Sequence, residues 1–230
     1  MDQREQMKVD SDNYDVFISY SRDNAQAVYA VATMLSVNGL HPFLDDWYLK
    51  ENDTQTHPRI VNVLGSVKYL IFCVSNSSMA KPWPQYEINE FTRKRNDPGN
   101  INKRITYLLL DDTDLSDGIR EEDCIDFRKN PRDWEKLFQR LGRPEIKINK
   151  EKFKEYIYHQ LPKKVEMYFG GSELHELCKT WTRCFVNHPE RINVLSIVGG
   201  GGLGKTSLIV KWLEQMKDWN YYGATHIFSW

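Results

Sequence analysis

The chain has 230 residues, and its 31 Lys and Arg against 32 Asp and Glu give a formal net charge of −1. A charge near zero does not indicate a nucleic-acid-binding protein. An apolar content of 40% is compatible with a packed core and argues against global disorder. The length allows one large or two small domains.

None of the four cysteines forms a C-x-x-C pair, and no histidine spacing suggests zinc. We interpret them as free thiols in a reducing compartment. Residues 1–13 are polar, and we expect them to be flexible and not to act as a signal peptide. No apolar run approaches the roughly 20 residues that cross a bilayer. We therefore expect a cytoplasmic protein with no structural metal and no membrane partner.

Short apolar runs alternate with helical spacings of apolar residues between positions 14 and 142. The expected strands cover residues 14–20, 42–44, 67–75, 104–110 and 124–127. The expected helices cover residues 25–38, 58–64, 82–95 and 134–141, and residues 46–57 are expected to form a polar loop. Strands that alternate with helices across short loops predict a parallel sheet covered on both faces. The sequence therefore predicts a five-stranded, doubly wound α/β domain.

Side chains that can carry chemistry gather where these strands end. Pro82 and Pro84 suit the first turn of a helix, so Trp83 and Glu87 share one face near its N-terminus. The strand just upstream brings this pair to the carboxyl edge of the sheet, where open parallel sheets bind ligands. The residues that leave the first two strands are Ser19, Tyr20, Ser21 and Arg22, then Asp45, Asp46 and Trp47.

Three of these segments resemble the motifs of the Toll/interleukin-1 receptor (TIR) domain, in order and in spacing. They are YDVFISY at residues 14–20, FLDDW at residues 43–47, and the pair Trp83-x-x-x-Glu87. The resemblance covers residues 14–142. It implies a flavodoxin-like fold with the strand order 2-1-3-4-5, which agrees with the alternation of strands and helices.

The resemblance also implies chemistry at Glu87, because the matching glutamate is catalytic in TIR domains that cleave NAD+. The reaction breaks the bond between nicotinamide and ribose, and its transition state should be cationic at the ribose. One carboxylate can stabilise that charge, and nicotinamide leaves without a general acid. We expect Glu87 to be exposed in a cleft. The candidates for binding NAD+ are Ser19, Tyr20, Ser21, Arg22, Asp45, Asp46, Trp47 and Trp83.

Each candidate also has a plain structural interpretation. Glu87 could be an ordinary first-turn glutamate that the helix dipole favours, and Trp83 could belong to the core and only border the site. Arg22 could pair with a phosphate or face solvent. Asp45 could cap its own loop, as aspartate often does.

The character of the sequence changes after Gly142. Residues 143–190 are expected to form a helical linker, with one amphipathic helix over residues 153–161 and a second that ends near residue 186. The segment YFGGSEL before the second helix resembles the entry segment of signal-transducing (STAND) NTPases. It departs from that pattern at Gly171, where the family usually has arginine.

A Walker A sequence follows, GGGGLGKT at residues 199–206. We expect a buried strand before it at residues 194–198 and a helix after it, the context that the motif requires. Loop N–H groups would hold the phosphates of ATP or ADP, and the Thr206 hydroxyl would bind Mg²⁺. The candidate nucleotide-binding residues are Gly199, Gly202, Gly204, Lys205, Thr206 and Ser207.

Residues 225–230 are expected to form the next strand. Too few residues follow the motif to supply a closed sheet and a Walker B acid. We therefore expect residues 191–230 to be an incomplete P-loop domain that does not hydrolyse ATP, within part of a longer TIR–STAND receptor.

These features favour an NAD+-cleaving TIR effector of immune or defence signalling, which acts when its TIR domains associate with one another or with other TIR or STAND protomers. The competing hypothesis is a non-enzymatic TIR scaffold, and a third makes the P-loop the main activity. The Trp83–Glu87 pair favours the enzyme. The early end at Trp230 disfavours the third hypothesis. Asn52 favours the scaffold, because many TIR domains have glycine there, in the BB loop (residues 50–53) that gates the pocket and contacts a neighbour. Aromatic residues are not interleaved with a basic stripe, so nucleic acid is not an expected partner.

Overall fold

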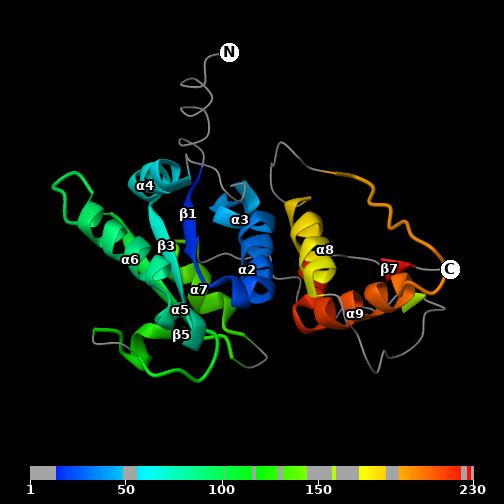
Figure 1. Ribbon diagram of the computed structural model, residues 1–230. Helices are drawn as coiled ribbons and strands as arrows, with labels where there is room; N and C mark the ends of the chain where they lie inside the picture. Colours follow the sequence, from blue (N-terminus) through cyan, green and yellow to red (C-terminus); the bar gives the residue numbers. More distant parts are fainter. Residues whose placement is uncertain are drawn as a thin grey trace, which may run out of the picture. The chain divides into compact units, whose positions relative to one another are not determined.

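The computed structural model describes residues 14–48, 56–100, 102–115, 118–128, 132–143, 157–158, 171–184, 192–223 and 227–228. The chain divides into two compact units, one of residues 1–28 and 38–146 and one of residues 29–37 and 147–230. Figure 1 shows the helices and strands of both units, with labels on many of them. None of the helices that the structure describes is long and apolar enough to span a membrane.

The first unit is built on a five-stranded parallel sheet with the order β2-β1-β3-β4-β5, which confirms the predicted order. The strands are β1 (Val16–Ser19), β2 (Pro42–Phe43), β3 (Tyr69–Val74), β4 (Arg104–Leu109) and β5 (Cys124–Asp126). The central strand β3 pairs with β1 and β4, and every one of its side chains is buried. A continuous apolar run is typical of a strand that is covered on both faces.

Four helices confirm the predicted ones in the first 142 residues, within a few residues at their ends. They are α2 (Ala25–Val37), α4 (Thr56–Ser66), α6 (Pro82–Arg95) and α7 (Trp134–Arg140). Gly39 follows α2 with a φ of +77°, the left-handed conformation that glycine adopts at the end of a helix. Pro82 is in the first turn of α6, where its missing N–H costs no hydrogen bond.

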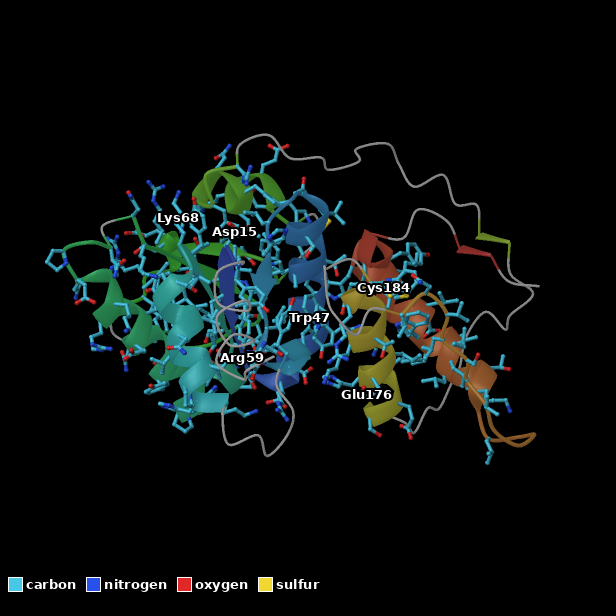
Figure 2. The ribbon with its side chains drawn as sticks, turned by 90° about the horizontal axis from the view of Figure 1, so that it is seen from above. Asp15, Trp47, Arg59, Lys68, Glu176 and Cys184 are labelled. Atoms are coloured by element: carbon cyan, nitrogen blue, oxygen red, sulfur yellow. The ribbon has the colours of Figure 1, made fainter. Side chains whose placement is uncertain are left out.

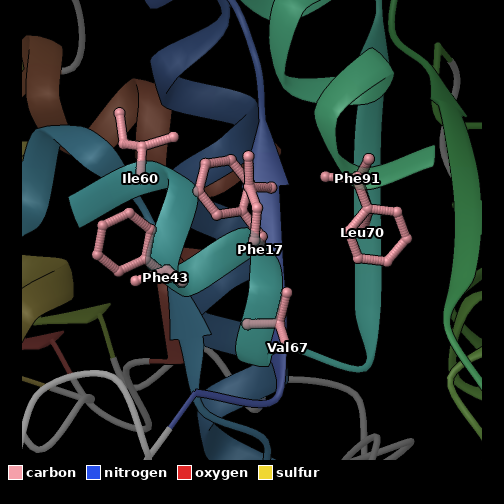
Figure 3. Packing of buried hydrophobic residues seen from close by; sticks show 8 residues of the cluster. Phe17, Phe43, Ile60, Val67, Leu70 and Phe91 are labelled. Atoms are coloured by element: carbon pink, nitrogen blue, oxygen red, sulfur yellow. The ribbon is translucent and has the colours of Figure 1, made fainter. Parts of the chain in front are cut away.

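One face of the sheet packs against α4 and α6 (Figure 3). Phe17, Phe43 and Leu70 from the sheet meet Ile60 from α4 and Phe91 from α6, and all five are buried. The rings of Phe17 and Phe43 stack with their centroids 5.3 Å apart. Each such buried side chain contributes about 1.5–3 kcal/mol to stability. This cluster fixes α6 on the sheet and thereby fixes the position of its N-terminal residues.

Two short helices lie where the sequence patterns predict none. The helix α3 (Asp45–Tyr48) occupies the start of the predicted polar loop. The helix α5 (Asn76–Ala80) begins after Ser75, whose hydroxyl accepts the N–H of Ser78 at 3.1 Å, while the Ser78 hydroxyl accepts the N–H of Ser75 at 2.9 Å. These two reciprocal hydrogen bonds form a capping box, which stabilises the first turn of α5. Two 3-10 turns, η1 (Arg22–Asn24) and η2 (Glu121–Asp123), complete the unit.

The second unit contains the helices α8 (Gly171–Arg183) and α9 (Lys205–Asp218) and the turn η3 (Asn220–Gly223). Its two strands, β6 (Ile157–Tyr158) and β7 (Ile227–Phe228), pair in parallel. The strand expected over residues 225–230 is therefore confirmed at β7. The prediction of a helix over residues 153–161 is wrong where it can be tested, because the only described residues of that range, 157–158, form the strand β6.

The prediction of a buried strand at residues 194–198 is also wrong. The segment has no regular structure, and Val198 is 91% exposed. Within the described part of the chain, no strand pairs with it, since β7 pairs with β6. An apolar run forms a buried strand only where neighbouring strands supply hydrogen bonds and cover its faces.

Candidate active site

Adjacent strands of the first unit end at the same edge of the sheet, and α6 brings one acidic side chain back to that edge. Ser19 is the last residue of β1, which lies between β2 and β3. The Ser19 hydroxyl donates a hydrogen bond of 2.5 Å to Oε2 of Glu87 in the first half of α6. The structure therefore brings together Ser19 and Glu87, which are the farthest apart in the sequence among the residues predicted for the NAD+ site.

Glu87 is 2% exposed, so the expectation that it is exposed in a cleft is wrong for this conformation. The reason is the register of α6. Glu87 lies four residues before Phe91 and shares its face, and that face is turned to the core. The carboxyl group is therefore packed beneath the helix, against the end of β1.

The surroundings of Glu87 favour its neutral form. Burial away from water raises the pKa of Glu87 well above its usual value, and the negative charge of Asp45 raises it further. Hydrogen bonds from the Ser19 hydroxyl and the Trp83 indole act in the opposite direction and lower the pKa. The two hydrogen bonds therefore offset only part of the effect of burial, and the pKa of Glu87 stays raised.

Asp45 is the second acidic group near this site. Burial raises its pKa, while the N–H of Asp46, which it accepts at 2.7 Å, lowers the pKa. The charge of Arg22 lowers it as well. This hydrogen bond joins neighbouring residues at the start of α3, so the capping interpretation of Asp45 stays a prediction.

The other predicted residues of this edge differ in accessibility. Trp47 lies on α3 and is labelled in Figure 2. It is 1% exposed, and Asp46, Tyr20 and Ser21 are buried as well. Arg22 is exposed. The predicted BB loop at residues 50–53 lies outside the described residues.

Sequence reasoning missed a charged cluster that joins the end of β1 to the start of α6. The Lys81 ammonium donates hydrogen bonds to the Ser21 hydroxyl at 2.8 Å and to the Asp23 carboxylate at 2.6 Å. These contacts lower the pKa of Asp23, with the hydrogen bond from Lys81 as the largest cause. No local pattern predicts this cluster, because Lys81 and Asp23 meet only in the folded sheet.

An aromatic rim beside Glu87 was also missed. The Trp83 ring is 37% exposed and stacks on Tyr86 with the centroids 5.5 Å apart. The ring of His57 from α4 lies 5.2 Å from Tyr86 and 6.0 Å from Trp83. The spacing of three between Trp83 and Tyr86 predicts their stacking on a helix, whereas the contribution of His57 depends on tertiary packing. We call His57, Trp83 and Tyr86 the aromatic rim.

Comparison with known protein families assigns the fold. The family profile described as "TIR domain" matches residues 16–141, which is more than half of the chain. The chain belongs to the TIR domain family. Among solved structures, it is similar to the TIR domain of the Toll-related receptor TRR-2 from Hydra magnipapillata, with 14% sequence identity and a TM-score of 0.46 over 56% of this chain and 98% of that chain. No curated protein matches the sequence.

The Walker A segment follows the TIR domain and lies in the second unit. Gly202 and Gly204 have φ values of +76° and +81°, and α9 begins directly after them at Lys205. The Lys205 ammonium donates hydrogen bonds of 2.7 Å to the carbonyls of Gly199 and Gly200. Such glycine conformations and an open helix N-terminus suit a phosphate group. In the parts of the chain that the structure describes, no group of three His, Cys, Asp or Glu could hold a metal ion.

Proposed function

We propose that the TIR domain cleaves NAD+ at the bond between nicotinamide and ribose, with Glu87 as its catalytic residue. The observation that carries the proposal is the placement of this carboxyl group at the carboxyl edge of the sheet, where the Ser19 hydroxyl and the Trp83 indole both donate to it. A carboxylate that is already oriented by two donors stabilises a developing positive charge with little reorganisation.

The raised pKa of Glu87 fits this chemistry. The nicotinamide ring of NAD+ carries a positive charge, and a positive charge near a carboxyl group lowers its pKa. Binding of NAD+ therefore favours the carboxylate form, which then faces the ribose as cationic character develops there. The aromatic rim offers exposed ring area for stacking on the nicotinamide or the adenine.

Access to Glu87 requires a rearrangement, because the side chain is almost fully buried. We propose that association of TIR domains supplies it, so that cleavage depends on protein concentration. In this proposal the Walker A segment belongs to a STAND module that binds ATP or ADP with Mg²⁺ and assembles protomers in a longer receptor. The output is immune or defence signalling through consumption of NAD+.

One observation favours a second candidate function, a non-enzymatic scaffold that signals by TIR–TIR contact. The hydrogen bond between Ser19 and Glu87 is buried and joins α6 to β1, which is what a purely structural glutamate would do. A scaffold would retain this bond and release no nicotinamide.

The deciding experiment measures nicotinamide release from NAD+ at high concentration of the full chain. Glu87→Gln keeps the shape and one hydrogen-bond acceptor, and we expect release to fall by about 100-fold or more, as when a preorganised charge-stabilising group is lost. The matched control is Glu90→Gln on the same helix, where the carboxylate is paired with Arg93 at 2.7 Å. Absence of release from the wild type, even after forced clustering of the chains, would establish the scaffold.

A further inference from the structure

A basic cavity lies at the opposite end of the TIR sheet from Glu87. It has a volume of about 270 Å³ and is lined by Arg95, Lys103, Arg104, Ile105, Thr106 and Arg140. Four of these six residues are cationic and none is acidic. They come from the end of α6, the beginning of β4 and the end of α7, so the fold gathers charges that are far apart in the sequence.

The register of the sheet creates the opening. β4 pairs with β3 from Arg104 to Leu109, but it pairs with β5 only from Tyr107 onward. The first three residues of β4 therefore have no strand on their β5 side. This end of the sheet holds the amino ends of the strands, near Lys68 and Asp15 in Figure 2.

The unpaired side of β4 presents a backbone donor to the cavity. The N–H of Arg104 points to β3, where it donates to the carbonyl of Lys68 at 3.0 Å. N–H groups alternate between the two sides of a strand, and the carbonyl of Leu109 accordingly accepts the N–H of Phe127 on the β5 side. The N–H of Ile105 therefore points to the β5 side, and no described residue accepts it.

Two of the cations already have partners within the protein. The buried Lys103 ammonium donates to the carbonyls of Leu64 and Val67 and lies 5.0 Å above the ring of Phe91. Arg140 donates to the carbonyl of Asp123. These partners are carbonyls and a ring, so they leave the positive charges uncompensated. Burial and the nearby charge of Lys94 lower the pKa of Lys103, which an anion in the cavity would counteract.

Arg95 and Arg104 differ from the neighbouring arginine of α6. Arg93 forms an ion pair of 2.7 Å with Glu90, whereas no carboxylate of the described residues lies within 4 Å of the guanidinium group of Arg95 or Arg104. Both arginine side chains are exposed and line the cavity, where they can meet a ligand.

We propose that this cavity binds the pyrophosphate group of a small phosphorylated anion. Arginine side chains recognise phosphate oxygens by paired N–H donors, and the N–H of Ile105 and the Thr106 hydroxyl add neutral donors at the cavity wall. The volume is near the lower limit of small-molecule sites, about 300 Å³, which favours a compact anion. The site is separate from the carboxyl edge that holds Glu87, so it does not depend on the cleavage of NAD+.

The test is a titration of the ¹⁵N-labelled full chain with inorganic pyrophosphate at constant ionic strength, followed by amide NMR. We expect a saturable shift with the amide of Ile105 among the largest. Arg104→Gln should weaken binding by about tenfold or more, because a bidentate contact is lost. Arg93→Gln removes the same charge from a paired arginine nearby and should leave the affinity unchanged. A parallel titration with ADP compares the affinity of the site for a nucleotide with its affinity for inorganic pyrophosphate.

The proposal is overturned if the shift does not saturate, or if both variants weaken binding equally, since that would be screening by net charge. It is also overturned if Arg104→Gln alters sedimentation of the chain but not the titration, which would make the cavity a contact between copies. Thermal unfolding shows whether each variant is folded. If Arg104→Gln does not fold, Arg95→Gln on α6 provides the same test.

Discussion

The carboxyl edge of the TIR sheet and the Walker A loop each hold an ionisable side chain near the start of a helix, but different contacts hold the two side chains. Glu87 is bonded to Ser19, 68 positions away in the sequence. Lys205 is bonded to Gly199 and Gly200, only six and five positions away. The first arrangement exists only when the sheet and α6 are packed, whereas the second is made within one loop.

This difference shows that the position of Glu87 depends on the packing of the whole core. The cluster of Phe17, Leu70 and Phe91 fixes α6 on the sheet, and α6 then carries Glu87 to β1. The Walker A loop depends on glycine conformations and on the start of α9. Substitutions in the core and in the second unit should therefore have effects of different sizes.

The largest expected effect on stability is that of Phe91→Ala. Phe91 is completely buried, and truncation of such a ring removes about 3–5 kcal/mol from the free energy of unfolding. The matched substitution in the second unit is Val198→Ala, which should change that free energy by less than about 0.5 kcal/mol because the side chain is exposed. Urea denaturation of both variants measures the contrast. Equal losses would show that residues 194–198 are packed in solution.

A smaller loss is expected for Ser19→Ala. The substitution leaves the buried carboxyl group of Glu87 without its 2.5 Å donor, and an unsatisfied buried group costs about 1–3 kcal/mol. It should also raise the pKa of Glu87 further, because the Ser19 hydroxyl lowers it. Thermal unfolding measures the first effect, and the pH profile of nicotinamide release measures the second. Ser66→Ala, which removes a hydroxyl that donates to the carbonyl of Val63, is the control. A loss no larger than that of the control would mean that the carboxyl group finds another donor.

The next prediction concerns pH. Because the pKa of Glu87 is raised in the folded protein, the unfolded chain loses this proton at lower pH than the folded chain does. The wild type therefore loses stability as the pH rises from the unfolded pKa near 4.5 to the folded pKa. Glu87→Gln cannot ionise, so its melting temperature should exceed that of the wild type at pH 8, with the difference shrinking towards pH 4. A difference that does not change with pH would show that the pKa is not raised.

Much of the TIR fold could be predicted from the sequence, because its signals are local. The apolar run of β3 indicates a central strand, and Pro82 indicates where α6 begins. The strand order follows from the resemblance to the family and is confirmed. The position of Glu87 at the carboxyl edge was likewise predictable from a strand and a helix that follow each other in the chain.

The burial of Glu87 was not predictable, because it depends on which face of α6 the core covers and on a partner at the end of β1. The contribution of His57 to the aromatic rim and the contact of Lys81 with Asp23 depend in the same way on tertiary packing. The prediction of a buried strand at residues 194–198 was wrong for a different reason. Its composition suits a buried strand, but composition does not say whether neighbouring strands are present.

The smallest expected effect is that of Lys205→Ala. The Lys205 ammonium bonds to two exposed carbonyls of its own loop, so its loss should change the free energy of unfolding by less than about 0.5 kcal/mol. Nicotinamide release should remain at the wild-type rate, because no contact of Lys205 involves the TIR domain among the described residues. Glu87→Gln in the same assay shows that the assay detects a loss of TIR chemistry. A strong loss of release in Lys205→Ala would mean that the Walker A loop controls the TIR domain within this chain, and the two regions would then not be independent.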